Sequence, residues 1–214
     1  MIRAIFFDVG ETLVDETRQW SDWADWLGIP RLTFLAAFGA VLERGEHHRR
    51  VFEIFTPGLD VEQAMREREA AGQGYKIELR DFYPDALPCL IALKDSGLFI
   101  GIAGNQPEAA EDALRDCGVT ADFIASSARW GIEKPSVRFF EEVVRQSGFD
   151  ANEIAYVGDR LDNDILPAAA IGLHTVFIER GPWGTLDGRK PEVFRADYVI
   201  RSLSELPSLL FDGR

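Results

Sequence analysis

The sequence predicts an α/β protein, built on a parallel sheet that helices cover and interrupted near its N-terminus by an all-helical insert. From about residue 80 onward, short apolar strands alternate with helical segments, many of which a glycine closes, and this alternation is typical of a parallel sheet. Residues 16–79 differ, because their apolar residues recur at helical spacing and no convincing strand occurs among them. We therefore expect two domains, a core of residues 1–15 and 80–214 and a helical insert of residues 16–79.

The first expected element is a buried strand at Ile2–Phe7, a short run of mostly apolar residues. In the insert, Trp20 and Trp23 begin a helical pattern. We expect these two and Trp26 to face the core of the insert, with the active-site cleft as the alternative, where one tryptophan would form a wall of the pocket. Asp60 begins a capping-box pattern that predicts a helix over Val61–Ala71.

Strands and helices alternate in the rest of the chain. Strands are predicted at Leu98–Ala103, Phe123–Ser126, Ile154–Val157, Thr175–Ile178 and Tyr198–Ile200. Helices are predicted at Asp85–Asp95, Glu108–Cys117, Ser136–Ser147, Asp164–Ile171 and Leu203–Leu210. We interpret Gly181–Gly188 as a surface loop. In a sheet of this kind, ligands bind beyond the carboxyl ends of the strands.

The composition limits the classes of partner. The chain has 214 residues, of which 46% are hydrophobic, and its formal net charge is −13. Such a charge repels nucleic-acid backbones and anionic membranes, so we expect neither as a partner. No apolar run approaches the roughly 18 residues of a membrane helix and no N-terminal signal segment is visible, which favours a cytoplasmic protein. Cys89 and Cys117 are expected to be reduced thiols, and the sequence leaves a monomer or a homodimer open.

Polar residues follow three of the predicted strands, at the edge where a parallel sheet binds its ligands. Asp8, Asn105 and Asp159 each lie just past a strand end, so we expect them to share one site. Asp164 follows on the helix after Asp159, and Lys134 precedes another helical run. Carboxylates and a lysine in this arrangement indicate a magnesium and phosphate site. A phosphate site in so acidic a protein needs a local cation, which Lys134 and a bound divalent metal would supply.

These residues stand in four short motifs that resemble those of the haloacid dehalogenase-like (HAD) hydrolase superfamily. The motifs, in chain order, lie within Phe6–Leu13, Ile102–Asn105, Glu133–Pro135 and Tyr156–Asp164. The resemblance covers essentially the whole chain and favours the phosphatase-type branch with a C1 helical cap. It implies a Rossmann-like core that the cap interrupts after the first strand, and it makes residues 16–79 the cap that closes over the site.

The resemblance also implies a role for each site residue. Asp8 matches the nucleophile that attacks phosphorus and forms an aspartyl-phosphate. Asp159 and Asp164 match the carboxylates that bind Mg²⁺ together with Asp8 and the backbone carbonyl of Gly10. Lys134 matches the lysine that neutralises the nucleophile and the phosphate. The implied substrate is a small phosphorylated molecule.

Two motifs depart from the family's pattern, each by a glycine. Gly10 stands where the family's phosphatases have a second aspartate, which protonates the leaving group and then activates water. Such general acid–base catalysis contributes about 10²–10⁴ in rate, and Glu11 is the adjacent carboxylate that could replace it. Gly104 stands where a Ser or Thr hydroxyl holds the phosphate, so the backbone N–H and the side chain of Asn105 are left to bind it.

Roles can also be predicted for residues within or near these motifs. Asp162 or Asn163 is expected to cap the helix that follows. Arg129 could border the site and contact the phosphate, since it follows the third strand of the core.

Three hypotheses remain open at this point. The first is a magnesium-dependent hydrolase that transfers the phosphoryl group of a small metabolite through Asp8, with weakened turnover. The second is a binding or regulatory protein that keeps magnesium and phosphate binding but has lost turnover, as Gly10 and Gly104 suggest. The third is a metal-free dehalogenase, against which the pattern Gly158–Asp164 argues, because it belongs to the metal-using branch.

Overall fold

The computed structural model describes residues 1–211, which form two compact units. The larger unit joins Met1–Asp15 to Ile77–Arg214, and the smaller unit is Glu16–Lys76. The last residues of the expected core, 212–214, lie outside the described part of the chain.

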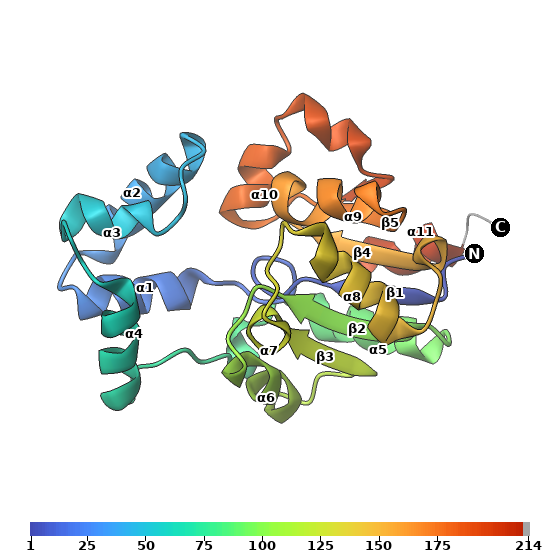
Figure 1. Ribbon diagram of the computed structural model, residues 1–214, viewed down its shortest axis with the longest axis horizontal. Coiled ribbons are helices and arrows are strands. Elements are labelled where there is room, and N and C mark those ends of the chain that lie inside the picture. The colour runs from blue at the N-terminus through green and yellow to red at the C-terminus, as the bar shows by residue number, and fades with distance from the viewer. Residues whose placement is uncertain (212–214) are drawn as a thin grey trace. The chain divides into compact units, whose positions relative to one another are not determined.

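The larger unit is built on one sheet of six parallel strands in the order β3-β2-β1-β4-β5-β6 (Figure 1). The strands are β1 (Ala4–Phe7), β2 (Phe99–Gly104), β3 (Phe123–Ser126), β4 (Ile154–Gly158), β5 (His174–Ile178) and β6 (Tyr198–Ile200). Each lies within two residues of its predicted position, and the predicted α/β fold with a parallel sheet is confirmed. Because β1 lies inside the sheet, it is buried on both faces, which explains its uninterrupted apolar sequence.

Helices follow the strands of the larger unit and cover both faces of the sheet. They are α5 (Ala86–Asp95), α6 (Ala109–Asp116), α7 (Ser127–Trp130), α8 (Val137–Ser147), α9 (Leu166–Ala170), α10 (Gly181–Asp187) and α11 (Leu206–Phe211). In Figure 1, α8 crosses the near face of the sheet and α5 lies behind it. The short helix α7 is an addition to the predicted elements.

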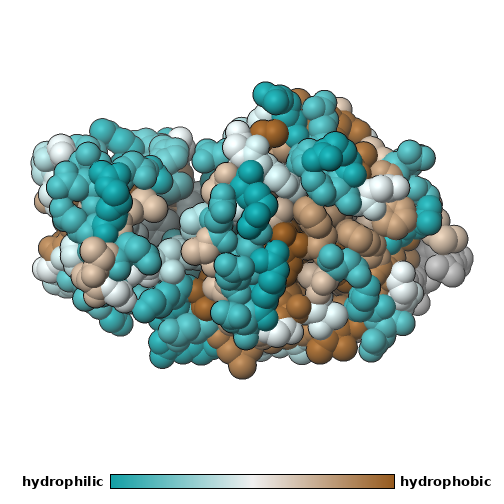
Figure 2. All heavy atoms as spheres, turned by 60° about the horizontal axis from the view of Figure 1, so that its bottom comes forward, coloured by the Kyte–Doolittle hydropathy of each residue, from teal (hydrophilic) through white to brown (hydrophobic). Residues whose placement is uncertain are grey.

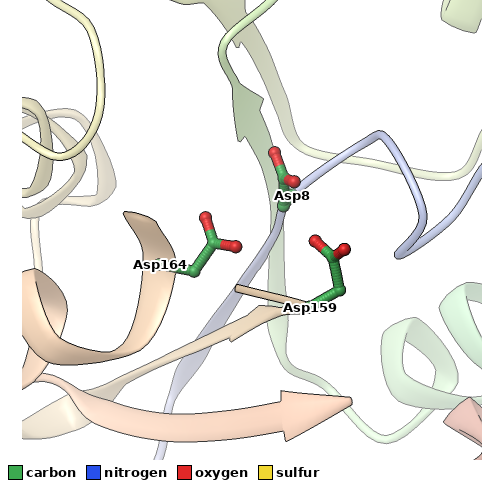
Figure 3. Close-up of side chains that lie close together, drawn as sticks. All are labelled: Asp8, Asp159 and Asp164. Carbon is green, nitrogen blue, oxygen red and sulfur yellow. The ribbon is translucent and has the colours of Figure 1, made fainter. Parts of the chain in front are cut away.

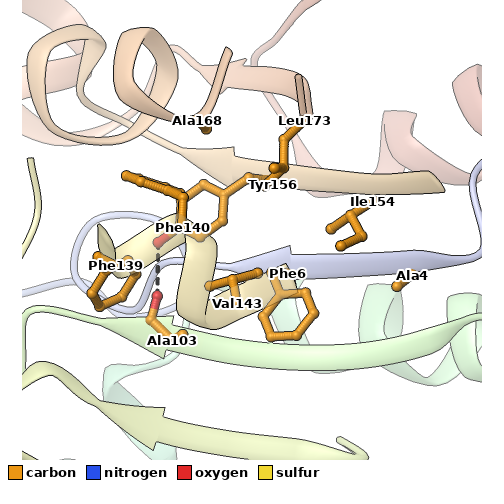
Figure 4. Close-up of a cluster of buried hydrophobic side chains, with 10 residues drawn as sticks. All are labelled: Ala4, Phe6, Ala103, Phe139, Phe140, Val143, Ile154, Tyr156, Ala168 and Leu173. Carbon is orange, nitrogen blue, oxygen red and sulfur yellow. Dashed lines mark hydrogen bonds between the residues drawn. The ribbon is translucent and has the colours of Figure 1, made fainter. Parts of the chain in front are cut away.

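One face of the sheet carries a large aromatic core, drawn in Figure 4. The side chains of Phe139, Phe140 and Val143 on α8 pack against Phe6 of β1 and Tyr156 of β4. The hydroxyl group of Tyr156 donates a hydrogen bond of 2.7 Å to the backbone carbonyl of Ala103, as the dashed line shows. The buried hydroxyl of Tyr156 thus has a partner near the end of β2, directly beside the expected site.

Residues 181–187 form a helix, whereas the sequence predicted a surface loop over Gly181–Gly188. The helix α10 begins with a proline in its first turn, where proline is well tolerated. Gly184 is needed for close packing, because a Cβ atom there would lie 2.8 Å from the carbonyl oxygen of Ile178. The glycines that suggested a loop therefore allow α10 to lie against the end of β5.

The smaller unit consists of four helices, α1 (Thr17–Trp26), α2 (Arg31–Glu43), α3 (Arg50–Phe55) and α4 (Val61–Ala70). Trp20 and Trp23 are buried in its core, as expected. The ring of Trp20 lies 4.3 Å from that of Phe38, and the ring of Trp23 lies 4.7 Å from that of Phe52. Hydrophilic residues cover much of the face of the molecule drawn in Figure 2.

None of the described helices is both long and apolar enough to span a membrane by itself. Taken together, α1 and α2 have the length and composition of a span, but the two helices are bent by 116° relative to each other.

The two segments that connect the larger unit to residues 16–76 lie side by side within the larger unit. Val14 forms an antiparallel bridge with Phe82. The backbone N–H of Asp15 donates to the carbonyl of Asp81 at 2.8 Å, and that of Tyr83 donates to Leu13 at 3.0 Å. The outgoing and returning chains are thus fixed to each other before residue 16 is reached.

Candidate active site

Three aspartates meet at the carboxyl edge of the sheet. Asp8 follows β1 and Asp159 follows β4, and these strands are neighbours in register, with Phe7 opposite Val157. Asp164 comes from the helical turn after β4. Figure 3 shows the three carboxylates gathered together, and each offers an oxygen within 4.8 Å of the others. All three side chains are buried, so the structure brings together the three carboxylates that the sequence predicted as one site.

Asp164 reaches this position through an unusual local structure. A π-helical turn, Leu161–Ile165, precedes α9, and such turns are frequent at functional sites. The carboxylate of Asp164 accepts a hydrogen bond of 3.1 Å from the backbone N–H of Arg160. A Cβ atom on Gly158 would lie 2.5 Å from the Asp164 side chain, so a glycine is needed where β4 ends.

The predicted cap of this helix is wrong. The turn begins before Asp162 and Asn163, and no side chain caps its first residue. Asp162 is exposed and pairs with Arg160 at 3.0 Å. Asp162 and Asn163 instead lie inside the π-helical turn.

Lys134 joins two of the three carboxylates. Its ammonium nitrogen lies 2.7 Å from Oδ1 of Asp8 and 2.5 Å from Oδ1 of Asp164, and the lysine is only 3% exposed. Asn105 fixes the backbone of Lys134 by two hydrogen bonds: its amide nitrogen donates to the lysine carbonyl at 2.9 Å, and its amide oxygen accepts from the lysine N–H at 2.8 Å. The Asn105 side chain therefore holds Lys134 in position through both its amide nitrogen and its amide oxygen.

The charges in this cluster shift one another's pKa values. Burial disfavours the charge of Lys134, but Asp164 and Asp8 outweigh burial and raise the pKa of the lysine well above its usual value. Burial and the charge of Asp8 raise the pKa of Asp164 to about 6, although Lys134 acts against them. Burial, followed by the charges of Asp164 and Asp8, raises the pKa of Asp159 well above 3.8. The site therefore holds more negative charge than one lysine balances.

A divalent metal fits this excess of charge. Oδ2 of Asp159 is buried and has no hydrogen-bond partner within the described chain. An unpaired carboxylate oxygen in such a place is unfavourable unless a cation or a donor reaches it. The available ligands are hard oxygens on Asp8, Asp159 and Asp164, which is the donor type that Mg²⁺ prefers.

Gly10 and Glu11 lie in the loop after β1, and they differ in their surroundings. Gly10 forms an isolated bridge with Val14. Glu11 is buried, and its carboxylate accepts a hydrogen bond of 2.6 Å from the hydroxyl of Tyr83. The group of acidic side chains gathered at the site includes Asp8 but not Glu11. The structure thus gives Glu11 a partner other than the nucleophile candidate.

Gly104 has a steric role that the sequence did not reveal. A Cβ atom at this position would lie 2.4 Å from Oδ1 of Asp8 and 3.4 Å from the backbone nitrogen of Val9. The carboxylate of Asp8 occupies the space that a side chain of residue 104 would need. The glycine therefore does more than remove a hydroxyl, because it permits the observed position of Asp8.

Arg129 pairs with the buried carboxylate of Glu111, at 2.8 Å to each of its oxygens. The expectation of a phosphate contact gains no support from this geometry.

Two residues that surround the site were not predicted from the sequence, Tyr156 and Tyr83. Tyr156 lies beneath Lys134, with the ammonium 5.5 Å from its ring centre, and a tyrosine inside a buried strand was the signal that a hydroxyl there needs a partner.

Comparisons with known proteins identify relatives of this chain. A family model described as haloacid dehalogenase-like hydrolase matches residues 2–172. A protein of Pyrococcus furiosus named glyceraldehyde 3-phosphate phosphatase is 30% identical over an alignment of 226 positions, which covers 98% of this chain and 92% of the relative. A protein of the same name from Methanocaldococcus jannaschii is 33% identical over 139 residues, 63% of this chain and 59% of that relative, so this match spans less than two thirds of the relative's length.

Solved structures show the same fold. A HAD phosphatase from Thermococcus onnurineus superposes with a TM-score of 0.64 at 23% identity, covering 98% of both chains. A dehalogenase superposes with a TM-score of 0.70 at 24% identity, covering 98% of this chain and 97% of the other. The chain belongs to the haloacid dehalogenase-like hydrolase family.

Proposed function

We propose that this protein is a magnesium-dependent phosphatase that acts on a small phosphorylated molecule through an aspartyl-phosphate on Asp8. One observation carries the proposal: Lys134 joins Asp8 to Asp164 while Oδ2 of Asp159 stays without a partner in the described chain. This arrangement suits a nucleophile held beside a cation site. The relatives named as phosphatases support it, since one of them aligns with almost the whole chain.

The proposed reaction has two displacement steps at phosphorus. In the first, a carboxylate oxygen of Asp8 forms a bond to phosphorus while the bond from phosphorus to the ester oxygen breaks. The released alkoxide takes a proton from solvent. In the second, water attacks the phosphorus of the aspartyl-phosphate, the acyl-phosphate bond breaks, and inorganic phosphate leaves with the restored carboxylate of Asp8 behind it.

Charge repulsion between the carboxylate and the phosphate is the main obstacle to the first step. The ammonium of Lys134 lies beside Asp8 and would offset it from one side. The residues that would hold the metal are Asp8, Asp159 and Asp164, with the backbone carbonyl of Gly10. When bound, Mg²⁺ supplies positive charge to the phosphate oxygens and to the nucleophile.

Gly10 makes the proton transfers the weak point of this mechanism. It has no side chain to protonate the leaving oxygen or to activate water, and the carboxylate of Glu11 is held by Tyr83. General acid–base help is worth about 10²–10⁴ in rate. We therefore assign the protein a weakened turnover, with esters of acidic alcohols as its better substrates.

The remaining assignments extend the same proposal. We place the backbone N–H groups at Gly104 and Asn105 on the phosphate, and we assign residues 16–79 the role of a cap that selects the substrate and excludes water. A small sugar phosphate or triose phosphate is the substrate class that the relatives' names support. We further propose a cytoplasmic protein, as a monomer or a homodimer.

The test is hydrolysis of p-nitrophenyl phosphate by the purified chain with MgCl₂, with Asp8→Asn as the control. Turnover that disappears in Asp8→Asn and after treatment with a chelator supports the proposal. A single burst of nitrophenol without turnover points to a trapped aspartyl-phosphate, as expected if only the second step fails. No reaction at all favours the binding or regulatory alternative, and activity that survives the chelator with a haloacid as substrate favours dehalogenation.

A further inference from the structure

Glu11 has an uncommon backbone conformation. Its φ is 54°, and among the described residues it alone combines a side chain with a positive φ. The left-handed conformation is unfavourable for a residue with a Cβ atom, and it persists only where the surroundings hold it. Glu11 is also buried, although it carries a carboxylate. Both features require a specific stabilising contact.

The carboxylate of Glu11 is enclosed between two residues from distant parts of the chain. The hydroxyl of Tyr83 donates to its Oε2 at 2.6 Å. On another side lies Gly181, where a Cβ atom would be 2.3 Å from the same oxygen. Burial and the charge of Glu11 raise the pKa of Tyr83, so the tyrosine keeps its proton and acts as the donor.

Tyr83 is itself held in place. The guanidinium carbon of Arg180 lies 4.1 Å from the centre of its ring, a favourable cation–π contact. Arg180 also donates to the backbone carbonyl of Thr12 at 3.1 Å and pairs with Asp85. The backbone N–H of Tyr83 donates to Leu13 at 3.0 Å. The loop that follows Asp8 is therefore tied to this network at Glu11, Thr12 and Leu13.

We propose that Tyr83 and Arg180 are positioning residues that hold Glu11, and through it the loop bearing Asp8 and Gly10, in the geometry required by the metal site. We call Glu11, Tyr83 and Arg180 the Glu11 latch. The inference rests on the proposed function in one respect, that Asp8 and Gly10 contribute oxygens to Mg²⁺. It gives Glu11 a task other than replacing the acid–base group that Gly10 lacks.

The first experiment measures hydrogen exchange in the loop after Asp8, in the metal-free chain. Hydrogen exchange of a peptide covering residues 9–15 reports the bonds from Glu11 N–H to Val14 and from Leu13 N–H to Val9. In metal-free Tyr83→Phe, exchange of these amides should accelerate about tenfold, because a hydrogen bond to a charged group is lost. Tyr198→Phe, on the distant strand β6, is the control and should leave them unchanged.

The second experiment measures binding of MgCl₂ alone by calorimetry. Tyr83→Phe should weaken Mg²⁺ binding about tenfold, whereas Tyr198→Phe should not. A merely structural tyrosine would change unfolding but not the affinity of the folded protein for Mg²⁺. Equal Mg²⁺ affinity in Tyr83→Phe and the natural chain would overturn the proposal.

A pair of glycine variants tests the same contact from the opposite side. Gly181→Ala places a Cβ atom against Glu11 and should weaken Mg²⁺ binding in the same direction as Tyr83→Phe. Gly172→Ala is the matched control, because its φ of +86° imposes similar backbone strain but no atom lies within 4 Å of the new Cβ. If both alanines weaken binding equally, the effect is general strain and the latch is refuted.

A double-mutant cycle shows whether Tyr83 acts through Glu11. In Glu11→Gly the backbone strain is absent and the carboxylate is gone. Adding Tyr83→Phe to this variant should change Mg²⁺ affinity by less than about twofold, because no coupling is left. An unchanged tenfold effect in that background would show that Tyr83 acts independently of Glu11. If the natural chain binds no Mg²⁺, the proposed function fails, and the exchange rates of the metal-free chain still decide whether the latch holds the loop.

Discussion

The ammonium nitrogen of Lys134 lies 2.7 Å from Oδ1 of Asp8, although 126 positions separate the two residues in the chain. Both side chains are buried, and the same ammonium pairs with Asp164. Truncating one partner of a buried ion pair leaves an uncompensated charge. The lysine is therefore part of the fold as well as of the site.

Lys134→Met should lower the free energy of unfolding of the metal-free chain by about 3–5 kcal/mol, the usual effect of breaking a buried pair. Urea unfolding followed by circular dichroism measures this difference. Lys94→Met removes a partly exposed pair with Asp122 and should change stability by about 0–1 kcal/mol. Similar losses in the two variants would contradict the special position of Lys134.

Gly10→Asp should raise turnover of a phosphate ester with a poor leaving group, such as glycerol phosphate, by about 10²–10⁴. The reason is that an alkoxide leaving group gains most from a proton donor. The kinetic constants of the variant and the natural chain are compared at saturating MgCl₂. Asp8→Asn combined with Gly10→Asp is the control and should remain inactive, whereas no gain in the single variant speaks for a protein that has lost more than this acid.

Gly104→Ser should reduce activity instead of restoring a phosphate contact. Its Cβ would lie 2.4 Å from Oδ1 of Asp8, so the carboxylate must move. A displacement of about 1 Å at a reacting group can lower the rate about 10²-fold. Steady-state kinetics with p-nitrophenyl phosphate measures the change, and Gly39→Ser, where the added atom meets nothing within 4 Å, should be neutral. Increased turnover in Gly104→Ser would show that Asp8 moves aside freely.

Asp159→Asn should stabilise the metal-free chain and abolish stabilisation by MgCl₂. The pKa of Asp159 is raised by burial and by neighbouring carboxylates. The unfavourable contribution of Asp159 to folding stability is therefore absent below pH 3.8, the ordinary pKa that applies in the unfolded chain. It grows as the pH rises toward the higher pKa of the folded chain. At pH ~7.5 the gain should be roughly 1–3 kcal/mol. Thermal melts with EDTA and with MgCl₂ measure it, and Asp116→Asn on the exposed face of α6 should show neither effect.

Glu111→Gln should destabilise the chain near neutral pH by about 1–3 kcal/mol, because its carboxylate accepts bonds from Ser126 and Arg129. Although burial opposes the charge, these bonds lower the pKa of Glu111 below 4.5. The stabilisation by Glu111 is thus present above pH 4.5 and is lost as the pH falls through the lower pKa of the folded chain. We expect the difference in the free energy of unfolding between Glu111→Gln and the natural chain to shrink as the pH falls from 7 to 3. The control Glu141→Gln should have the same free energy of unfolding as the natural chain throughout.

The sequence was sufficient to locate Asp8 and Asp159, because both directly follow strands whose apolar pattern is unmistakable. A parallel sheet then brings neighbouring strand ends to one edge. The orientation of Asp164 was beyond this reasoning, since it depends on a π-helical turn that no residue pattern marks. The partners of Asn105 and Glu11 were equally hidden, because Lys134 and Tyr83 reach them only in the folded chain.

The roles of two glycines show what the sequence pattern leaves out. In α10 the glycines suggested a loop, yet Gly184 serves close packing of a helix. At Gly104 the family's pattern pointed to a missing hydroxyl, and the structure adds that Asp8 occupies the space that a side chain would need. A glycine in a sequence marks either a backbone conformation or a near neighbour, and the neighbour is visible only in three dimensions.

The bridge between Val14 and Phe82 has a consequence for how such a chain can change over time. Because the outgoing and returning segments are already joined there, the ends of residues 16–76 are anchored at one place on the larger unit. A different insertion could start and end at the same two anchors and leave the sheet as it is. The sheet-containing unit and the inserted unit can therefore change independently of each other during evolution.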